Sequence, residues 1–141
     1  MESTFGSILT ALGTGLPVLL VQLAVTLALL AVGVAVYTRI TPFNERRLVS
    51  EGNTAGGLTL AGSIVALAIP LAATLATSAF LLDILLWGVV AVILQLVAFA
   101  VATLLIRDLR GQIESGNVAS AATLVGVQLG VALINAAAMA G

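Results

Sequence analysis

Four long apolar stretches, separated by short polar segments, dominate the pattern of the chain. They run from about residue 16 to 38, 58 to 80, 84 to 106 and 119 to 139, and none has a charged residue in its interior. A helix needs roughly 20 apolar residues to cross about 30 Å of hydrocarbon, so each stretch is long enough to span a bilayer. The pattern predicts an all-α integral membrane protein with four transmembrane helices, forming one membrane domain over residues 1–141.

The composition supports the same class. Of the 141 residues, 61% are hydrophobic and 8% are charged, and the mean hydropathy is +1.25. An average soluble domain is about 45–50% apolar and about 25% charged, so this chain could not cover a globule with polar surface. It also has no Cys and no His, which leaves no thiolate or imidazole for a metal site or for nucleophilic catalysis. We therefore expect no enzymatic activity, no cofactor and no bound metal. The net charge of −1 gives no basic surface for nucleic acid.

The charged residues indicate how the helices are oriented. The five basic residues lie in two segments, 39–57 and 107–118, which join the first span to the second and the third to the fourth. They are Arg39, Arg46, Arg47, Arg107 and Arg110. The other side carries only Glu2 and Asp83. By the positive-inside rule, we expect both arginine-bearing loops in the cytoplasm and both termini outside it. We expect the first stretch to be a span and not a cleavable signal, because no basic residue precedes it.

The two arginine-bearing loops resemble each other. At an offset of 64 residues, Arg46 matches Arg110, and the pair Gly52–Asn53 matches the pair Gly116–Asn117. This similarity predicts an internal duplication, with one repeat at about residues 16–80 and the other at about 84–139. Each repeat is a helical hairpin of two spans, so the two hairpins have the same, parallel orientation.

The two Gly–Asn pairs are suited to begin a helix. Asn is a preferred N-cap, because its side chain accepts a hydrogen bond from an unpaired backbone N–H one turn into the helix. The preceding Gly allows a sharp reversal of the chain. We expect Asn53 and Asn117 to cap the second and fourth spans. The alternative is that they line a polar vestibule at the cytoplasmic mouth of a path, and the two roles are compatible.

Small residues form a stripe along the second and fourth spans. The stripe includes Gly62 and Ala66 in the second span and Ala122, Gly126 and Gly130 in the fourth. Such stripes let helix backbones approach closely. We expect these two spans to pack against each other or to form the seam of a homo-oligomer. A thin wall along a pathway is the alternative.

The first and third spans are rich in Leu, Val and Ile on all sides, so we expect them to face lipid. Tyr37 lies near the inner end of the first span and Trp87 near the outer end of the third. Aromatic residues at these levels are typical interfacial anchors.

Four amide side chains lie at membrane depth, namely Gln22, Gln95, Gln128 and Asn135. An unpaired amide in hydrocarbon costs several kcal/mol, so each needs a partner. They either bridge helices or line a path for water or solute, and the pattern leaves both open. No Asp, Glu or Arg lies at the same depth, which argues against a proton-coupled transporter.

The loop and span motifs together resemble a known family. Residues 45–55 read Glu-Arg-Arg-Leu-Val-Ser-Glu-Gly-Asn-Thr-Ala and are followed by Gly62 and Pro70, and the second copy ends in Gly130-Val-Ala-Leu-Ile-Asn135-Ala-Ala. With these motifs, most of the chain resembles the bacterial inner-membrane proteins grouped as "domain of unknown function 350". The resemblance implies a small, multi-pass protein of the inner (cytoplasmic) membrane with four spans in two repeats. It implies no activity.

Two functional hypotheses follow. The leading one is an oligomeric channel or transport subunit whose path is lined by the four intramembrane amides. The alternative is a membrane scaffold or adaptor that docks a soluble cytoplasmic partner or anionic lipid through the five arginines, each of which near a membrane surface contributes about 1 kcal/mol. The arginines could also serve topology alone.

Overall fold

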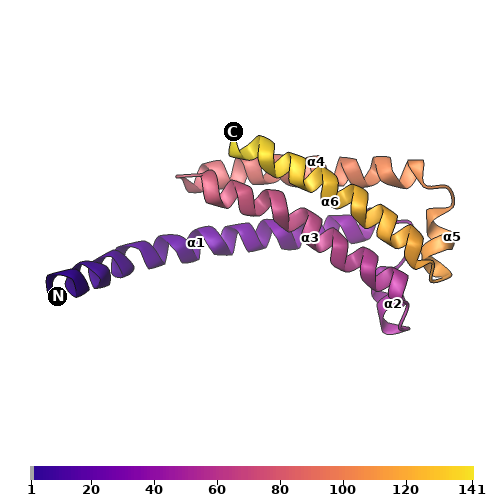
Figure 1. The fold of residues 1–141 in the computed structure, drawn as a ribbon, viewed down its shortest axis with the longest axis horizontal. Coiled ribbons are helices and arrows are strands. Elements are labelled where there is room, and N and C mark those ends of the chain that lie inside the picture. Colours follow the sequence, from indigo (N-terminus) through magenta and orange to yellow (C-terminus); the bar gives the residue numbers. More distant parts are fainter. Residues whose placement is uncertain (1) are drawn as a thin grey trace.

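The computed structural model describes the backbone of residues 2–141 and the side chains from Thr4 onward, and it contains no strand in this part of the chain (Figure 1). Its helices are α1 (Glu2–Ile40), α2 (Glu45–Ser50), α3 (Thr54–Thr77), α4 (Leu81–Leu105), α5 (Leu109–Glu114) and α6 (Val118–Ala140). The helices α1, α3, α4 and α6 are long and apolar enough to cross a membrane. The predicted all-helical fold with four spans is therefore confirmed.

Helix α1 is much longer than the predicted first span. It begins at Glu2 instead of about residue 16 and continues through Pro17 for 39 residues. The hydropathy pattern predicted that the first span begins at about residue 16, where the uninterrupted apolar run begins. The helix also includes residues 2–15, which mix polar and apolar side chains. Hydroxyl groups in that segment bond back to the helix, for example from Thr10 to the Gly6 carbonyl and from Thr14 to the Thr10 carbonyl, 3.0 Å each. At about 1.5 Å per residue, α1 is about 58 Å long.

The bundle is built around the pair α3 and α6, which make the most extensive contact between helices. Helix α4 packs against both, and the second half of α1 lies against α3 and α4. The first half of α1 extends past the other helices, so that residues 4–21 are exposed on all sides (Figure 1).

Each predicted arginine-bearing loop contains a short helix, α2 or α5, and both lie at the same end of the bundle (Figure 1). Buried apolar side chains attach these short helices to the bundle, Phe43 and Leu48 at α2 and Leu109 and Ile113 at α5. We call residues 39–53 and 106–117 the arginine end, because all five arginines lie there.

The elements of the arginine end recur at the offset of 64 residues found in the sequence. Asn44 and Asp108 are the N-caps of α2 and α5. Gly52 and Gly116 both have positive φ angles, 76° and 84°. These correspondences are what an internal duplication would produce, and the duplication itself stays a prediction.

Helices α3 and α6 pack against each other, but the small-residue stripe of α6 does not face α3. Ala122, Gly126 and Gly130 are exposed, whereas Gly62 and Ala66 of α3 are buried. Gly62 lies against the branched side chain of Val125 on α6. Close packing explains the difference, because two facing glycines would leave a space that the valine fills.

The lipid-facing expectation for the first and third spans is wrong in part. Tyr37 is only 1% exposed, and its ring packs edge-on against Phe99 with 4.7 Å between centroids, so it is no interfacial anchor. Helix α4 buries one whole face, which includes Ile84, Ala91 and Gln95. Because a bundle of four helices needs apolar surface for its own packing, α4 presents only its remaining face to lipid. Trp87 lies on that remaining face and is 55% exposed.

Candidate functional site

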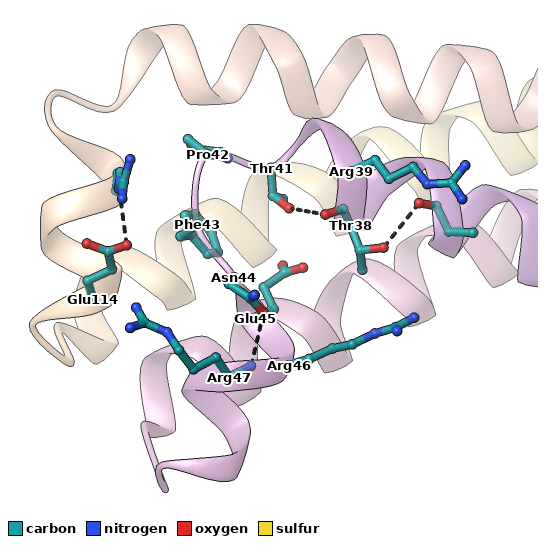
Figure 2. A pocket seen from close by; sticks show the side chains of 12 residues that line it. Thr38, Arg39, Thr41, Pro42, Phe43, Asn44, Glu45, Arg46, Arg47 and Glu114 are labelled. Atoms are coloured by element: carbon teal, nitrogen blue, oxygen red, sulfur yellow. Dashed lines mark hydrogen bonds and ion pairs between the residues drawn. The ribbon is translucent and has the colours of Figure 1, made fainter.

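A cavity of about 570 Å³ opens at the arginine end, between the last turn of α1, helix α2 and helix α5 (Figure 2). Its lining includes Arg39, Arg46, Arg47 and Arg110, together with Glu45 and Glu114. Figure 2 shows the side chains of Arg39 and Arg46 extending to one side of the view and that of Arg47 to the other, toward Glu114. Arg107 does not line this cavity. The fold thus gathers four of the five predicted loop arginines around one space.

Local sequence determines how α2 presents its arginines. Asn44 begins the helix, because its side-chain oxygen accepts a hydrogen bond of 3.0 Å from the backbone N–H of Arg47. Phe43 and Leu48, which are 4% and 2% exposed, turn the apolar side of this segment toward the bundle. Arg46 and Arg47 are then left on the exposed side.

The cavity arginines are weakly paired. Arg47 lies 3.8 Å from Glu51, and Arg110 lies 3.1 Å from Glu114. Both are pairs one helical turn apart with exposed arginines, and such pairs contribute little because water and salt screen them. Among the described residues, Arg39 and Arg46 form no ion pair. These guanidinium groups are therefore available to an external anion.

Glu45 is the one acid that the fold buries at this end, at 2% exposure. Its Oε1 accepts a hydrogen bond from the Tyr37 hydroxyl, and its Oε2 has no hydrogen-bond partner among the described residues. Burial raises the pKa of Glu45 to about 7, and the hydrogen bond from Tyr37 offsets only part of that rise. Sequence reasoning missed this residue, because a single acid inside a basic loop carries no periodic signal of burial.

The two predicted N-cap asparagines occupy the cap positions. Asn53 accepts from the Gly56 N–H (2.9 Å), and Asn117 accepts from the Ser120 N–H (3.3 Å). Asn53 also donates to the backbone carbonyls of Ile113 (3.0 Å) and Glu114 (3.1 Å) at the end of α5. It therefore joins the two predicted repeats. Neither asparagine lines the arginine-rich cavity.

The structure brings three of the four intramembrane amides together between α4 and α6. Gln95 donates to the backbone carbonyl of Gln128 (2.8 Å), and Asn135 donates to the backbone carbonyl of Ala91 (3.3 Å). The side-chain oxygen of Gln128 accepts from Ser63 of α3 (2.8 Å). Each of these bonds bridges two helices. Gln22 lies apart, half-buried on α1 beside a mostly apolar hollow.

Comparison with known proteins agrees with the membrane architecture. A model of the family described as Domain of Unknown Function (DUF350) matches residues 11–139. The chain is 30% identical over 112 residues to the UPF0719 inner membrane protein YjfL of Escherichia coli (strain K12), an alignment that covers 79% of this chain and 85% of that protein. The protein of the same name from Escherichia coli O157:H7 matches with the same figures. No solved structure matches the chain. The relatives and the four apolar helices together identify a multi-pass inner membrane protein.

Proposed function

The chain belongs to the family described as Domain of Unknown Function (DUF350), and we propose that it binds an anionic phospholipid headgroup in the arginine-lined cavity. The observation that carries the proposal is the cavity of about 570 Å³ that gathers four of the five arginines, two of them without an ion pair among the described residues. The proposal includes the predicted orientation, with the arginine end at the cytoplasmic surface.

The position of the cavity suits a lipid better than a dissolved ligand. Ala35, Thr38 and Arg39 of the spanning helix α1 form part of its wall, so the cavity lies where a spanning helix ends and headgroups begin. Apolar side chains at the same end stay exposed, with Ile40 at 48%, Leu104 at 85% and Leu105 at 77%. Acyl chains can cover these side chains while the headgroup occupies the cavity. Basic pockets beside spanning helices on this side of a membrane are typical sites for anionic headgroups.

The chemistry of the cavity suits a phosphate. A guanidinium group donates two parallel hydrogen bonds to phosphate oxygens and stays charged at any physiological pH. No carboxylate in the described part of the chain pairs with Arg39 or Arg46, and the exposed pairs of Arg47 and Arg110 are weak enough to be exchanged for a phosphate.

Lipid titration of the purified protein tests the proposal. Thermal unfolding is followed in neutral detergent while phosphatidylglycerol or the zwitterionic phosphatidylcholine is added. We expect phosphatidylglycerol to raise the melting temperature and phosphatidylcholine to have little effect. Since an arginine near a membrane surface contributes about 1 kcal/mol, Arg39→Gln and Arg46→Gln should each weaken the apparent affinity about fivefold.

Arg107→Gln is the matched control, because it removes the same charge from the same end of the bundle without touching the cavity lining. It should keep the affinity for phosphatidylglycerol within about twofold. An equal loss in all three variants would mean that only the overall charge matters, and it would overturn the assignment to this cavity. Equal stabilisation by a water-soluble glycerol phosphate would replace the lipid with a soluble anion.

The channel hypothesis keeps one supporting observation. Ala122, Gly126 and Gly130 form an exposed stripe on α6, and a side chain added at either glycine would meet no atom within 4 Å. This face leaves room for a second copy to approach closely. The molar mass of the purified protein in lipid nanodiscs will test the predicted homo-oligomer. A path lined by the intramembrane amides stays a prediction.

A further inference from the structure

A small enclosed cavity lies inside the bundle, where α1, α3, α4 and α6 meet. It has a volume of about 10 Å³ and is lined by Tyr37, Ser63, Ala66, Leu67, Gln95, Leu96, Phe99 and Gln128. That volume corresponds to about one water-sized probe. Aromatic and aliphatic side chains form most of the lining. Each of the four spanning helices also contributes one polar side chain, namely Tyr37, Ser63, Gln95 and Gln128.

Two amide atoms at this cavity are buried and lack hydrogen-bond partners among the described residues. They are Oε1 of Gln95, an acceptor, and Nε2 of Gln128, a donor. The other ends of both amides are occupied, because Gln95 donates to the Gln128 backbone carbonyl and Gln128 accepts from Ser63. Nearly all buried polar groups in folded proteins are paired with protein or with water.

We propose that this cavity is a binding site for a single water molecule, which accepts a hydrogen bond from Gln128 Nε2 and donates one to Gln95 Oε1. A water molecule supplies both of the complementary groups that these two atoms require. The site is separate from the proposed lipid cavity, because the two cavities share no lining residue.

The hydroxyl of Ser63 favours a second orientation of the Gln128 amide, and the proposed water fits that orientation as well. Ser63 lies 2.8 Å from both the Thr59 carbonyl and Gln128 Oε1, but it has only one proton to donate. Rotating the Gln128 amide by half a turn resolves this conflict, because its Nε2 then donates to Ser63 while Ser63 donates to Thr59. Oε1 of Gln128 then faces the cavity, and a water molecule serves this arrangement as well by donating to both glutamines.

Tyr37 connects this site to the arginine end. Tyr37 forms one wall of the enclosed cavity and donates its hydroxyl proton to Glu45, which lines the arginine-rich cavity. In this proposal the amides of Gln95 and Gln128 hold one enclosed water molecule. This role differs from lining a continuous path, as in the channel hypothesis.

Pulsed X-ray hydroxyl labelling with mass spectrometry tests the site, because a bound water is converted to a hydroxyl radical in place and modifies its neighbours. Phe99 lines the cavity and is 2% exposed, so bulk radicals reach it poorly. We expect Phe99 to be labelled by X-ray pulses at least fivefold more than by radicals generated in bulk solution. Gln128→Met, of similar volume but without the amide, should bring the labelling of Phe99 to the bulk level.

Gln22→Met is the matched control, because it removes an intramembrane amide that does not line the cavity, and it should leave the labelling unchanged. Ala66→Val, which fills the cavity with methyl groups, gives a second test if Gln128→Met does not fold, and it should also remove the labelling. X-ray labelling of Phe99 at the bulk level in the unmodified protein would overturn the proposal. So would labelling that persists in Gln128→Met or Ala66→Val.

Discussion

At the scale of single residues, the arginine end depends on one buried acid among several arginines. Glu45 is 2% exposed and forms no ion pair within the described part of the chain, although four arginines line the same cavity. Its carboxyl group accepts a hydrogen bond from the Tyr37 hydroxyl. A buried carboxylate without a cation is costly, so folding favours the protonated form. The stability of the bundle should therefore depend on pH through this residue.

Glu45 should make the protein less stable as the pH rises from about 5 to about 7. Its pKa is about 7 in the folded state, against an ordinary value of 4.5, so the folded state binds more protons in this range. The free energy of unfolding then falls with pH and levels off above the folded pKa. The slope due to one group is at most about 1.4 kcal/mol per pH unit. Reversible unfolding in mixed micelles between pH 5 and 8 measures it.

Glu45→Gln should remove this slope, since the amide is neutral at every pH and still accepts from Tyr37. Glu51→Gln is the control, because Glu51 is an exposed acid of the same loop, and its slope should match that of the unmodified protein. An unchanged slope in Glu45→Gln would show that another group titrates.

At the scale of helices, two glycines at equivalent places in the predicted repeats have opposite surroundings. Gly62 and Gly126 are separated by the repeat offset of 64 residues. A Cβ at position 62 would collide with the side chain of Val125, whereas a Cβ at position 126 would meet nothing within 4 Å. Helix α3 therefore uses its glycine for packing inside the chain, and α6 leaves its own on the exposed face.

Gly62→Ala should destabilise the protein by about 1–3 kcal/mol, because an added methyl group forces α3 away from α6. Gly126→Ala should be neutral or stabilise by up to about 1 kcal/mol, because alanine favours the helix and the added methyl group meets open space. Unfolding of the two variants in the same detergent compares them directly. Equal destabilisation by both would mean that the Gly126 face is covered by another copy of the chain.

At the scale of the whole molecule, the two ends of the bundle differ in charge. All five arginines lie at one end, while Asp83 and the C-terminus lie at the other (Figure 1). Helix α1, at about 58 Å, is also longer than the hydrocarbon thickness of about 30 Å, so it crosses tilted or extends beyond the bilayer. The charge asymmetry favours the orientation with the arginine end in the cytoplasm.

Cysteine labelling should establish this orientation, since the chain has no cysteine of its own. Ser50→Cys is placed at the arginine end and Ala79→Cys in the turn at the opposite end, and both positions are exposed. In intact spheroplasts, a membrane-impermeant maleimide should label Ala79→Cys and leave Ser50→Cys unmodified until the cells are lysed. The reverse pattern would place the arginine end outside and would contradict the proposed site.

Much of the architecture could be predicted because the bilayer imposes it on the sequence. Apolar stretches of about 20 residues must become spanning helices, since hydrocarbon offers no partner for backbone N–H and C=O groups. The cap positions of Asn53 and Asn117 were also readable, because a cap depends on neighbours within one turn. The start of α1 was missed, since its first turns mix small, polar and apolar residues and carry no continuous apolar pattern.

The sequence by itself thus determined the number of spans, the helix caps and the separation of charge. Only the tertiary structure decided which face of each helix is buried. Helices that are apolar on all sides carry no periodic signal of their contacts, so the sequence left open that Gly62 would meet Val125 while Gly126 stayed exposed. The burial of Tyr37 and Glu45 and the gathering of the arginines also depend on residues far apart in the chain. Close packing of particular side chains selects among these arrangements, and it acts only once the helices have come together.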